Sequence, residues 1–334
     1  MGFKDLENCK LCAWGCGVDR LTGEQGVCMM GLPEVASCQL HPAPPQSYTI
    51  FTAGCNFRCL NCQNWQIAHY PCIKIPVQGL LDPGTIAHNG VKAIHSFGGQ
   101  LIGADRIFFS GGSPTVSLPW IEDVVAQVKL LDPEIKVNFD TNGFPSQKSF
   151  QRILSFSDSI TFDFKAFNDE VHRSLTGAPV EPVLRNAEVM AKNFDRLWEF
   201  RVLIIPSIVD LPEIQAIIEF LVDLNESLPI CFLAFRPNYC LESLPGASRK
   251  LMEEAVILAQ KHGMSSVKWS GFTDIPGKII KPPTSHSKVF HHEQAAIAAH
   301  YSQLAGCRRT KRMCGKCEFQ NSCKLKPYLP TRSR

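Results

Sequence analysis

The 334-residue sequence has no apolar run near the roughly 20 residues that a membrane-spanning helix requires, so we expect no contact with a membrane. Its start lacks the charged-then-apolar pattern of a signal peptide, and Leu6 stands where a myristoylation site has Ser or Thr. These observations predict a cytoplasmic protein. Charged residues make up only 19% and hydrophobic residues 45%, a balance typical of a globular chain rather than a disordered one. The sequence contains no internal repeat and no low-complexity segment.

Cysteine, by contrast, is abundant, with 15 residues. Because a cytoplasm keeps thiols reduced, metal ligation explains them better than disulfides do. Eleven of them form three groups, and we expect Cys38, Cys72, Cys231 and Cys240 to pack in the core. The groups are Cys9, Cys12, Cys16 and Cys28 (C-x2-C-x3-C-x11-C); Cys55, Cys59 and Cys62 (C-x3-C-x2-C); and Cys307, Cys314, Cys317 and Cys323 (C-x6-C-x2-C-x5-C).

Short apolar runs alternate with amphipathic segments between the second and third groups. This alternation predicts parallel strands joined by right-handed crossovers, and six such units suit an α/β fold, a partial (β/α)6 barrel open on one side. Expected strands are 48–53, 106–110, 136–140, 159–164, 199–205 and 229–235. The clearest expected helices are 120–131, 146–156, 182–194, 212–224 and 247–262, and a further helix is expected near 288–305. We expect three parts: a metal-binding segment (1–45), the barrel (46–245) and a helical extension with a basic tail (246–334). In such folds the chemistry gathers at the carboxyl ends of the strands.

The central cysteine group follows the first expected strand. Three closely spaced thiolates can hold three irons of a cubane cluster and leave the fourth iron open; a zinc loop completed by His69 or Cys72 is the alternative. The motif of Cys55, Cys59 and Cys62 resembles the signature of the radical S-adenosylmethionine (SAM) superfamily. Over residues 5–240 the chain resembles the pyruvate formate-lyase activating enzymes and their uncharacterised relatives. The resemblance implies a [4Fe–4S] cluster that binds SAM, a flavodoxin- or ferredoxin-type electron donor, and cleavage of SAM to methionine and a 5′-deoxyadenosyl radical.

Further motifs of that family lie at the ends of the later strands. Gly111-Gly112-Ser113 resembles the Gly-Gly-Glu motif beside the methionine end of SAM, with Ser113 in place of the acidic residue. The resemblance implies that Asp140 and Thr141 of an Asp-Thr-Asn-Gly motif, which also contains Asn142, hold a monovalent cation together with Asp163. It also implies that Lys165, His172 and Arg201 contact the carboxylate and ribose of SAM.

Three further positions complete the expected site. The residue before the last cysteine of the motif is commonly aromatic in the family and packs on the adenine; here it is Asn61, and Trp65 is expected to replace it. After the sixth strand, Arg236 and Tyr239 are expected to face the cavity and orient the substrate, and Tyr239 is our candidate for a catalytic side chain.

The outer two cysteine groups can each hold zinc, mononuclear iron or a second iron–sulfur cluster. At the N-terminus we favour a structural clip; at the C-terminus the alternatives are electron relay, substrate binding or a structural plug. From Cys307 onward the chain carries a net charge of +8, and the remainder carries −5. Such a tail can attract nucleic acid, but it can also offset the negative charge of a thiolate-bound metal, and we favour the second reading.

The sequence therefore predicts a radical SAM enzyme that abstracts hydrogen from a carbon of a protein or peptide residue. The extra cysteine groups resemble those of enzymes that methylate Arg or Gln of methyl-coenzyme M reductase with cobalamin. No Asp-x-His-x-x-Gly motif is present, so cobalamin would bind without a protein histidine ligand. The alternative is a glycyl-radical activase. RNA modification is disfavoured because the basic tail lacks interleaved aromatic residues, so we expect no nucleic-acid partner.

Overall fold

The computed structural model describes residues 3–331, and the chain divides into two compact units. The first comprises Met1–Asn56 and Asn64–Thr161, and the second comprises Phe57–Gln63 and Phe162–Arg334. The expected three-part division at residues 45 and 245 stays a prediction. Across the described part of the chain, no helix combines the length and the apolar character needed to cross a membrane.

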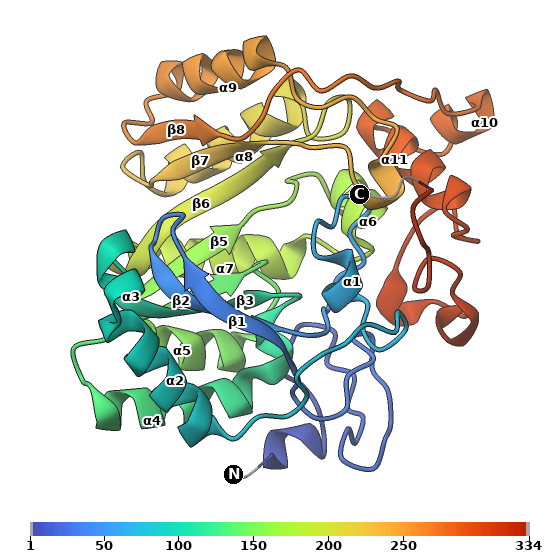
Figure 1. The fold of residues 1–334 in the computed structure, drawn as a ribbon. Helices are drawn as coiled ribbons and strands as arrows, with labels where there is room; N and C mark the ends of the chain where they lie inside the picture. Colours follow the sequence, from blue (N-terminus) through green and yellow to red (C-terminus); the bar gives the residue numbers. More distant parts are fainter. Residues whose placement is uncertain (1–2, 332–334) are drawn as a thin grey trace. The chain divides into compact units, whose positions relative to one another are not determined.

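The first unit is built on four strands that pair in chain order. They are β1 (Val35–His41), β2 (Ser47–Thr52), β3 (Arg106–Gly111) and β4 (Lys136–Thr141). β1 is antiparallel to β2, whereas β2, β3 and β4 run parallel. The unit's helices are α1 (Trp65–Ala68), α2 (Pro83–His95), α3 (Phe97–Ile102), α4 (Leu118–Leu131) and α5 (Gln147–Phe156). Helices α2 and α4 pack side by side (Figure 1), as expected for crossovers between parallel strands.

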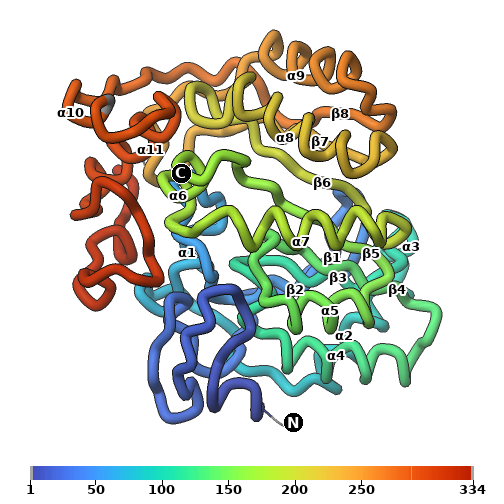
Figure 2. Tube along the Cα trace, turned by 180° about the vertical axis from the view of Figure 1, so that it is seen from behind, coloured from blue at the N-terminus to red at the C-terminus, as the bar shows by residue number. Residues whose placement is uncertain are grey.

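The second unit continues the same pattern. β5 (Ser159–Asp163) enters it at Phe162, and β6 (Leu197–Ile204), β7 (Ile230–Ala234) and β8 (Val267–Ser270) pair in parallel. Its helices are α6 (Asp169–Thr176), α7 (Glu181–Lys192), α8 (Leu211–Leu224), α9 (Arg249–Lys261), α10 (Thr284–Ser287) and α11 (Glu293–Leu304). Figure 2 shows α8 and α9 lying side by side, and α11 packs against α6.

The α/β class with parallel strands is confirmed, and all six expected strands are present with ends shifted by at most two residues. β1 and β8 were not expected. In β1 the polar residues Ser37, Gln39 and His41 interrupt the apolar run, and β8 has only four residues. Helix α11 begins at Glu293, five residues later than expected. The Glu170 carboxylate accepts hydrogen bonds from the backbone N–H groups of His291 and His292, at 2.8 and 3.4 Å, and holds the preceding turn outside the helix.

Candidate functional site

The central cysteine motif lies on a loop, residues 55–62, which we call the cysteine loop. It begins just after β2, where Gly54 has a φ of 80° that favours glycine. A Cβ at Gly54 would lie only 2.2 Å from Met30 Cγ, so a side chain at this position would also clash with Met30. The Gly54 N–H donates to the carbonyl of Ile67 at 2.8 Å, next to the buried Cys55.

The two glycines after β3 bring that turn close to the strand end. Gly112 N–H donates to Thr52 O and Ser113 N–H donates to Gly54 O, both at 2.9 Å. A Cβ on Gly112 would lie 2.1 Å from Gly54 O, and one on Gly111 would lie 2.4 Å from Thr52 O. Backbone packing alone therefore requires both glycines. The Ser113 hydroxyl is buried beside them with no hydrogen-bond partner among the described residues.

The end of β4 is bonded to the same loop. Asp140 Oδ2 accepts a hydrogen bond from Ser110 Oγ at 2.7 Å, and Thr141 Oγ1 accepts one from the Gly143 N–H at 3.1 Å. Asn142 Nδ2 donates to Asn56 Oδ1 at 2.7 Å. In the first unit, the residue after Cys55 is thus fixed by a residue of the predicted Asp-Thr-Asn-Gly motif.

The second part of the cysteine loop, residues 57–62, is bonded to the end of α6. Arg58 N–H donates to Thr176 O at 2.8 Å, and Leu60 N–H donates to Leu175 O at 3.0 Å. Cys59 and Cys62 are half-buried on this segment. Asn61 is buried, and its side-chain carbonyl oxygen has no hydrogen-bond partner within residues 3–331. Trp65, which was expected to replace the aromatic residue at position 61, is buried at the start of α1 in the first unit.

His172 lies in α6 with its side chain fully buried. Burial lowers its pKa to about 4, so the ring is neutral at physiological pH. Nδ1–H therefore donates to the carbonyl of Ala178 at 2.8 Å, and Nε2 is left as an acceptor with no partner in the described chain. The His172 ring packs edge-on against Phe57 of the cysteine loop, with centroids 5.5 Å apart.

Two ion pairs involve the remaining predicted residues of the second unit. Lys165 Nζ contacts Asp163 Oδ2 at 2.7 Å, just after β5. Arg201 Nε contacts Glu199 Oε1 at 2.7 Å on β6, and the Arg201 carbonyl accepts from the Phe164 N–H at 2.8 Å. The structure thus brings the ends of β5 and β6 together, with both cations already close to carboxylates.

The two side chains expected to orient substrate are engaged elsewhere. Tyr239 is buried, and its hydroxyl donates to the carbonyl of Leu325 at 2.8 Å; burial raises its pKa well above the ordinary value. Arg236 is exposed and lies over the ring of Phe272, 5.5 Å from its centroid. A catalytic role for Tyr239 stays a prediction, and in this arrangement its hydroxyl binds the C-terminal segment.

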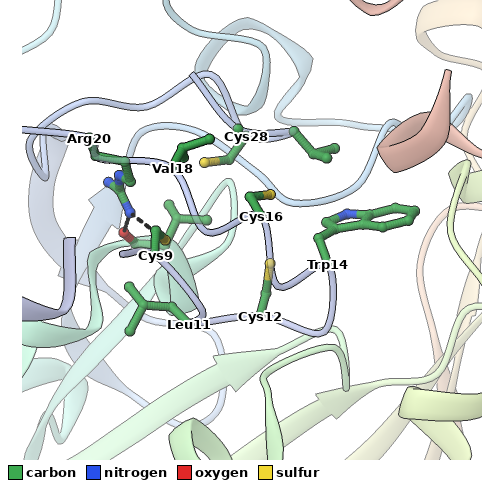
Figure 3. Close-up of a pocket in the computed structure, with 11 residues that line it drawn as sticks. Cys9, Leu11, Cys12, Trp14, Cys16, Val18, Arg20 and Cys28 are labelled. Atoms are coloured by element: carbon green, nitrogen blue, oxygen red, sulfur yellow. Dashed lines mark hydrogen bonds between the residues drawn. The ribbon is translucent and has the colours of Figure 1, made fainter. Parts of the chain in front are cut away.

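The N-terminal cysteine group, Cys9, Cys12, Cys16 and Cys28, surrounds one cavity with a volume of about 10 Å³ (Figure 3). Arg20 is buried beside it and donates to the carbonyls of Met30, Gly31 and Val116 at 3.0, 2.9 and 2.8 Å. Its Nη1 lies 3.8 Å from Cys9 Sγ. Burial and the neighbouring Cys28 raise the pKa of the Cys12 thiol.

The same N-terminal group is bonded to both motifs of the first unit. Trp14 Nε1–H donates to Asn56 O at 2.8 Å, and Ala13 N–H donates to Phe144 O at 3.0 Å. The Trp14 and Phe144 rings are 5.2 Å apart. The residues between Cys12 and Cys16 thus contact the cysteine loop and the turn after β4.

The C-terminal cysteine group, Cys307, Cys314, Cys317 and Cys323, follows α11 and is half-buried. Cys314 N–H donates to Gly177 O at 2.8 Å, which places the group at the end of α6. Burial raises the pKa of the Cys314 thiol. Within residues 3–331, no three Cys, His, Asp or Glu side chains already stand at the spacing of a metal site, and both ligand sets stay predictions.

A [4Fe–4S] cluster and SAM suit the residues of the cysteine loop and its surroundings. The loop supplies three soft thiol ligands from one short segment, as iron–sulfur clusters require. Buried polar atoms are costly without partners. Such atoms on motif residues are Ser113 Oγ in the first unit and Asn61 Oδ1 and His172 Nε2 in the second, and each is able to form a hydrogen bond with a polar ligand.

Spacing alone missed four residues that hold the cysteine loop: Trp14, Asn56, Arg58 and Arg312. Three of them act through main-chain groups of the loop, which any residue type supplies. The one available signal was the position of Trp14 inside the first cysteine motif.

The model of the radical SAM superfamily matches residues 49–221, more than half of the chain. The chain therefore belongs to this superfamily. Two uncharacterized proteins of Methanocaldococcus jannaschii are similar over 78% of this chain, at 24% and 27% identity, covering 77% and 74% of their own lengths.

The pyruvate formate-lyase-activating enzyme of Staphylococcus aureus is 28% identical over 182 residues, which are 52% of this chain and 68% of that enzyme. Among solved structures, Streptococcus suis SuiB bound to S-adenosylmethionine is similar with a TM-score of 0.49 and 14% identity. That similarity covers 65% of this chain and 48% of SuiB.

Proposed function

We propose that this radical SAM enzyme abstracts a carbon-bound hydrogen atom from a residue of a protein or peptide. When bound, the cluster and SAM supply the 5′-deoxyadenosyl radical, with one electron from a flavodoxin- or ferredoxin-type donor. The observation that carries the proposal is the bonding of the cysteine loop to motif residues, above all the 2.7 Å hydrogen bond from Asn142 to Asn56. The loop is thereby held at the strand ends, where the chemistry of parallel α/β folds gathers.

The proposed roles follow the resemblance of each motif to those of the family. Cys55, Cys59 and Cys62 would ligate the cluster, and Gly111, Gly112 and Ser113 would lie along the methionine end of SAM. By the family resemblance, Asp140, Thr141 and Asp163 would supply hard oxygen ligands to a monovalent cation. His172 would accept a hydrogen bond at Nε2, since its ring is neutral and Nδ1 already donates to Ala178. Lys165 and Arg201 would supply the cations for the SAM carboxylate.

The test of SAM cleavage is the formation of 5′-deoxyadenosine by the reduced, anaerobically reconstituted chain. Cys55→Ala, Cys59→Ala and Cys62→Ala should each abolish the product, because each removes a cluster ligand. Cys38→Ala, on β1, is the matched control and should retain it. Product from any of the three loop variants would contradict the assignment. Loss of metal from Cys72→Ala would instead favour a zinc loop.

A glycyl-radical activase is the second candidate, and it is supported by the similarity to the pyruvate formate-lyase-activating enzyme. Hydrogen abstraction from a protein residue can also lead to cobalamin-dependent methylation of a carbon, such as that of a glutamine in methyl-coenzyme M reductase. Addition of hydroxocobalamin before gel filtration distinguishes this methyltransferase from the activase. Stoichiometric retention favours the methyltransferase, whereas 5′-deoxyadenosine formation without retention favours the activase. Modification of RNA would require binding of nucleic acid by the basic tail.

For the N-terminal cysteine group we propose a single metal ion, zinc or iron, rather than a cubane cluster. Its cavity of about 10 Å³ has room for about one water-sized atom. Four thiolates around one divalent ion form a tetrahedral site with a formal charge of about −2. Arg20, buried at the cavity edge 3.8 Å from Cys9 Sγ, would offset part of that charge.

A further inference from the structure

Arg312 lies within the C-terminal cysteine group, and its side chain is buried, with only 2% exposed. Its guanidinium donates to three main-chain carbonyls: Ser174 at 2.7 Å, Leu175 at 3.1 Å and Arg58 at 2.6 Å. Two of these acceptors belong to the last turn of α6, where the carbonyls lack helical partners. The third belongs to the cysteine loop, in the residue just before Cys59.

The charge of Arg312 has no carboxylate to balance it. Across residues 3–331, no salt bridge joins Arg312 to an Asp or Glu, whereas Cys314 Sγ lies 4.0 Å from its Nη2. A buried cation is stable only where an opposite charge compensates it.

Metal binding would supply that opposite charge. Thiols must lose their protons to ligate a metal. Four thiolates around zinc or a [4Fe–4S] core therefore carry a formal charge of about −2. Protonated thiols would leave Arg312 without a counter-charge. The buried arginine thus favours the ligated, anionic form of the C-terminal group.

The group is also packed tightly against the end of α6. Gly177 ends that helix with a φ of 82°, and a Cβ there would lie 2.3 Å from Cys314 Sγ. The same helix end accepts the N–H groups of Arg58 and Leu60. The helix end therefore holds the C-terminal cysteine group on one side and the segment bearing Cys59 on the other, and Arg312 bonds to both.

We propose that Cys307, Cys314, Cys317 and Cys323 bind a tetrathiolate metal centre and that Arg312 is a positioning residue between it and the cysteine loop. Arg312 offsets the negative charge of the C-terminal centre and of the cluster ligated by Cys59, and it fixes the Arg58 carbonyl. The proposal rests on the radical SAM assignment for the second of these centres only.

Measurement of metal content tests whether the C-terminal cysteine group binds a metal centre. The full chain is reconstituted anaerobically, and iron, sulfide and zinc are counted for the parent, Cys314→Ser and Cys317→Ser, with Cys38→Ser as the control. Each C-terminal variant should lose one centre, about four irons with their sulfides or about one zinc. Iron loss identifies a cluster and zinc loss a single ion. Unchanged metal in both variants would overturn the proposed site. Cys55→Ala serves separately, because failure of that variant to lose iron would contradict the radical SAM assignment instead.

Arg312→Met and Arg312→Lys test whether Arg312 is a positioning residue. Removal of a positive charge near an anionic cluster disfavours the addition of an electron. Arg312→Met should therefore make the midpoint potential of the cluster at the cysteine loop more negative. Arg312→Lys keeps the charge and should restore most of the potential, although it cannot reproduce the fork of three hydrogen bonds. Potentiometric titration followed by electron paramagnetic resonance measures the midpoint potential of both variants.

Equal potentials in Arg312→Lys and the parent, with Arg312→Met shifted, support the proposal. An unshifted Arg312→Met, or equal shifts in both variants, would overturn the electrostatic role. If Arg312→Met does not fold, the comparison of Arg312→Lys with Cys314→Ser still decides, because loss of the anionic C-terminal centre should raise the potential.

Discussion

The N-terminal and C-terminal cysteine groups both fix a carbonyl of the cysteine loop, but they do so through different side chains. Each has four cysteines, a buried arginine that donates to main-chain carbonyls and lies within 4.0 Å of a cysteine sulfur, and a hydrogen bond to a carbonyl of the cysteine loop. At the N-terminus the arginine and the loop contact are separate, because Trp14 rather than Arg20 reaches the loop. At the C-terminus Arg312 does both.

This difference separates packing from charge. The N-terminal group holds Asn56 through a neutral indole N–H, which is insensitive to the state of a nearby metal. The C-terminal group holds Arg58 through a cation whose burial depends on anionic neighbours. We therefore expect the N-terminal group to act on the loop by shape alone, and the C-terminal group to act by shape and potential.

The largest expected effect comes from replacing one glycine beside each cysteine group and comparing the losses of stability. Gly177→Ala should destabilise the chain by about 3 kcal/mol, since it adds a Cβ 2.3 Å from Cys314 Sγ at a left-handed φ. Gly26→Ala places its Cβ 3.0 Å from Cys16 Sγ without a positive φ, and should cost about 1 kcal/mol. Urea unfolding of the two variants measures the difference. Equal losses would mean that the two groups are packed equally tightly.

Acid should weaken the C-terminal side through His172. Its folded pKa of about 4 lies below the ordinary value, so the unfolded chain binds the proton more readily. The stabilisation is complete above about pH 6.5 and is lost as the pH falls towards 4, by about 2 kcal/mol between pH 7 and 5. His172→Gln should abolish this part of the slope in urea unfolding of the metal-free chain. A slope that persists undiminished would assign the acid sensitivity to other groups.

The smallest effect is expected at Trp14. Trp14→Phe removes the 2.8 Å hydrogen bond to Asn56 O but keeps a ring against Phe144, so the free energy of unfolding should fall by about 1 kcal/mol. The midpoint potential of the cluster should stay the same, in contrast to Arg312→Met. A shift in potential as large as that of Arg312→Met would remove the distinction between the two groups.

The sequence predicted the elements whose local pattern is strong. Parallel strands buried on both faces read as continuous apolar runs, such as Ile107-Phe108-Phe109 in β3, and these were located correctly. The motif residues at the ends of β3 and β4 do lie beside the cysteine loop in the first unit. The antiparallel strand β1 was not predicted because its polar residues break the apolar run.

The contacts that fix the loop escaped for a different reason. Arg58 and Arg312 are 254 positions apart, and the bond between them uses a main-chain carbonyl that no residue type reveals. Tyr239 follows β7 in the chain and was expected to face the cavity, but its hydroxyl donates to the carbonyl of Leu325, a residue in no recognisable motif. Side-chain direction at a strand end depends on the segments that pack there, and local sequence does not specify them.

The distance between Arg58 and Arg312 along the chain also has a consequence for biosynthesis. The segment bearing Cys59 is made well before Arg312, which lies 254 positions beyond Arg58 and supplies the hydrogen bond to the Arg58 carbonyl. Domains fold as they emerge during synthesis, and contacts of such long range form last. The loop therefore reaches its final backbone bonding only after Arg312 has been synthesised. Cofactor insertion into the completed loop is thereby expected to follow the synthesis of Arg312.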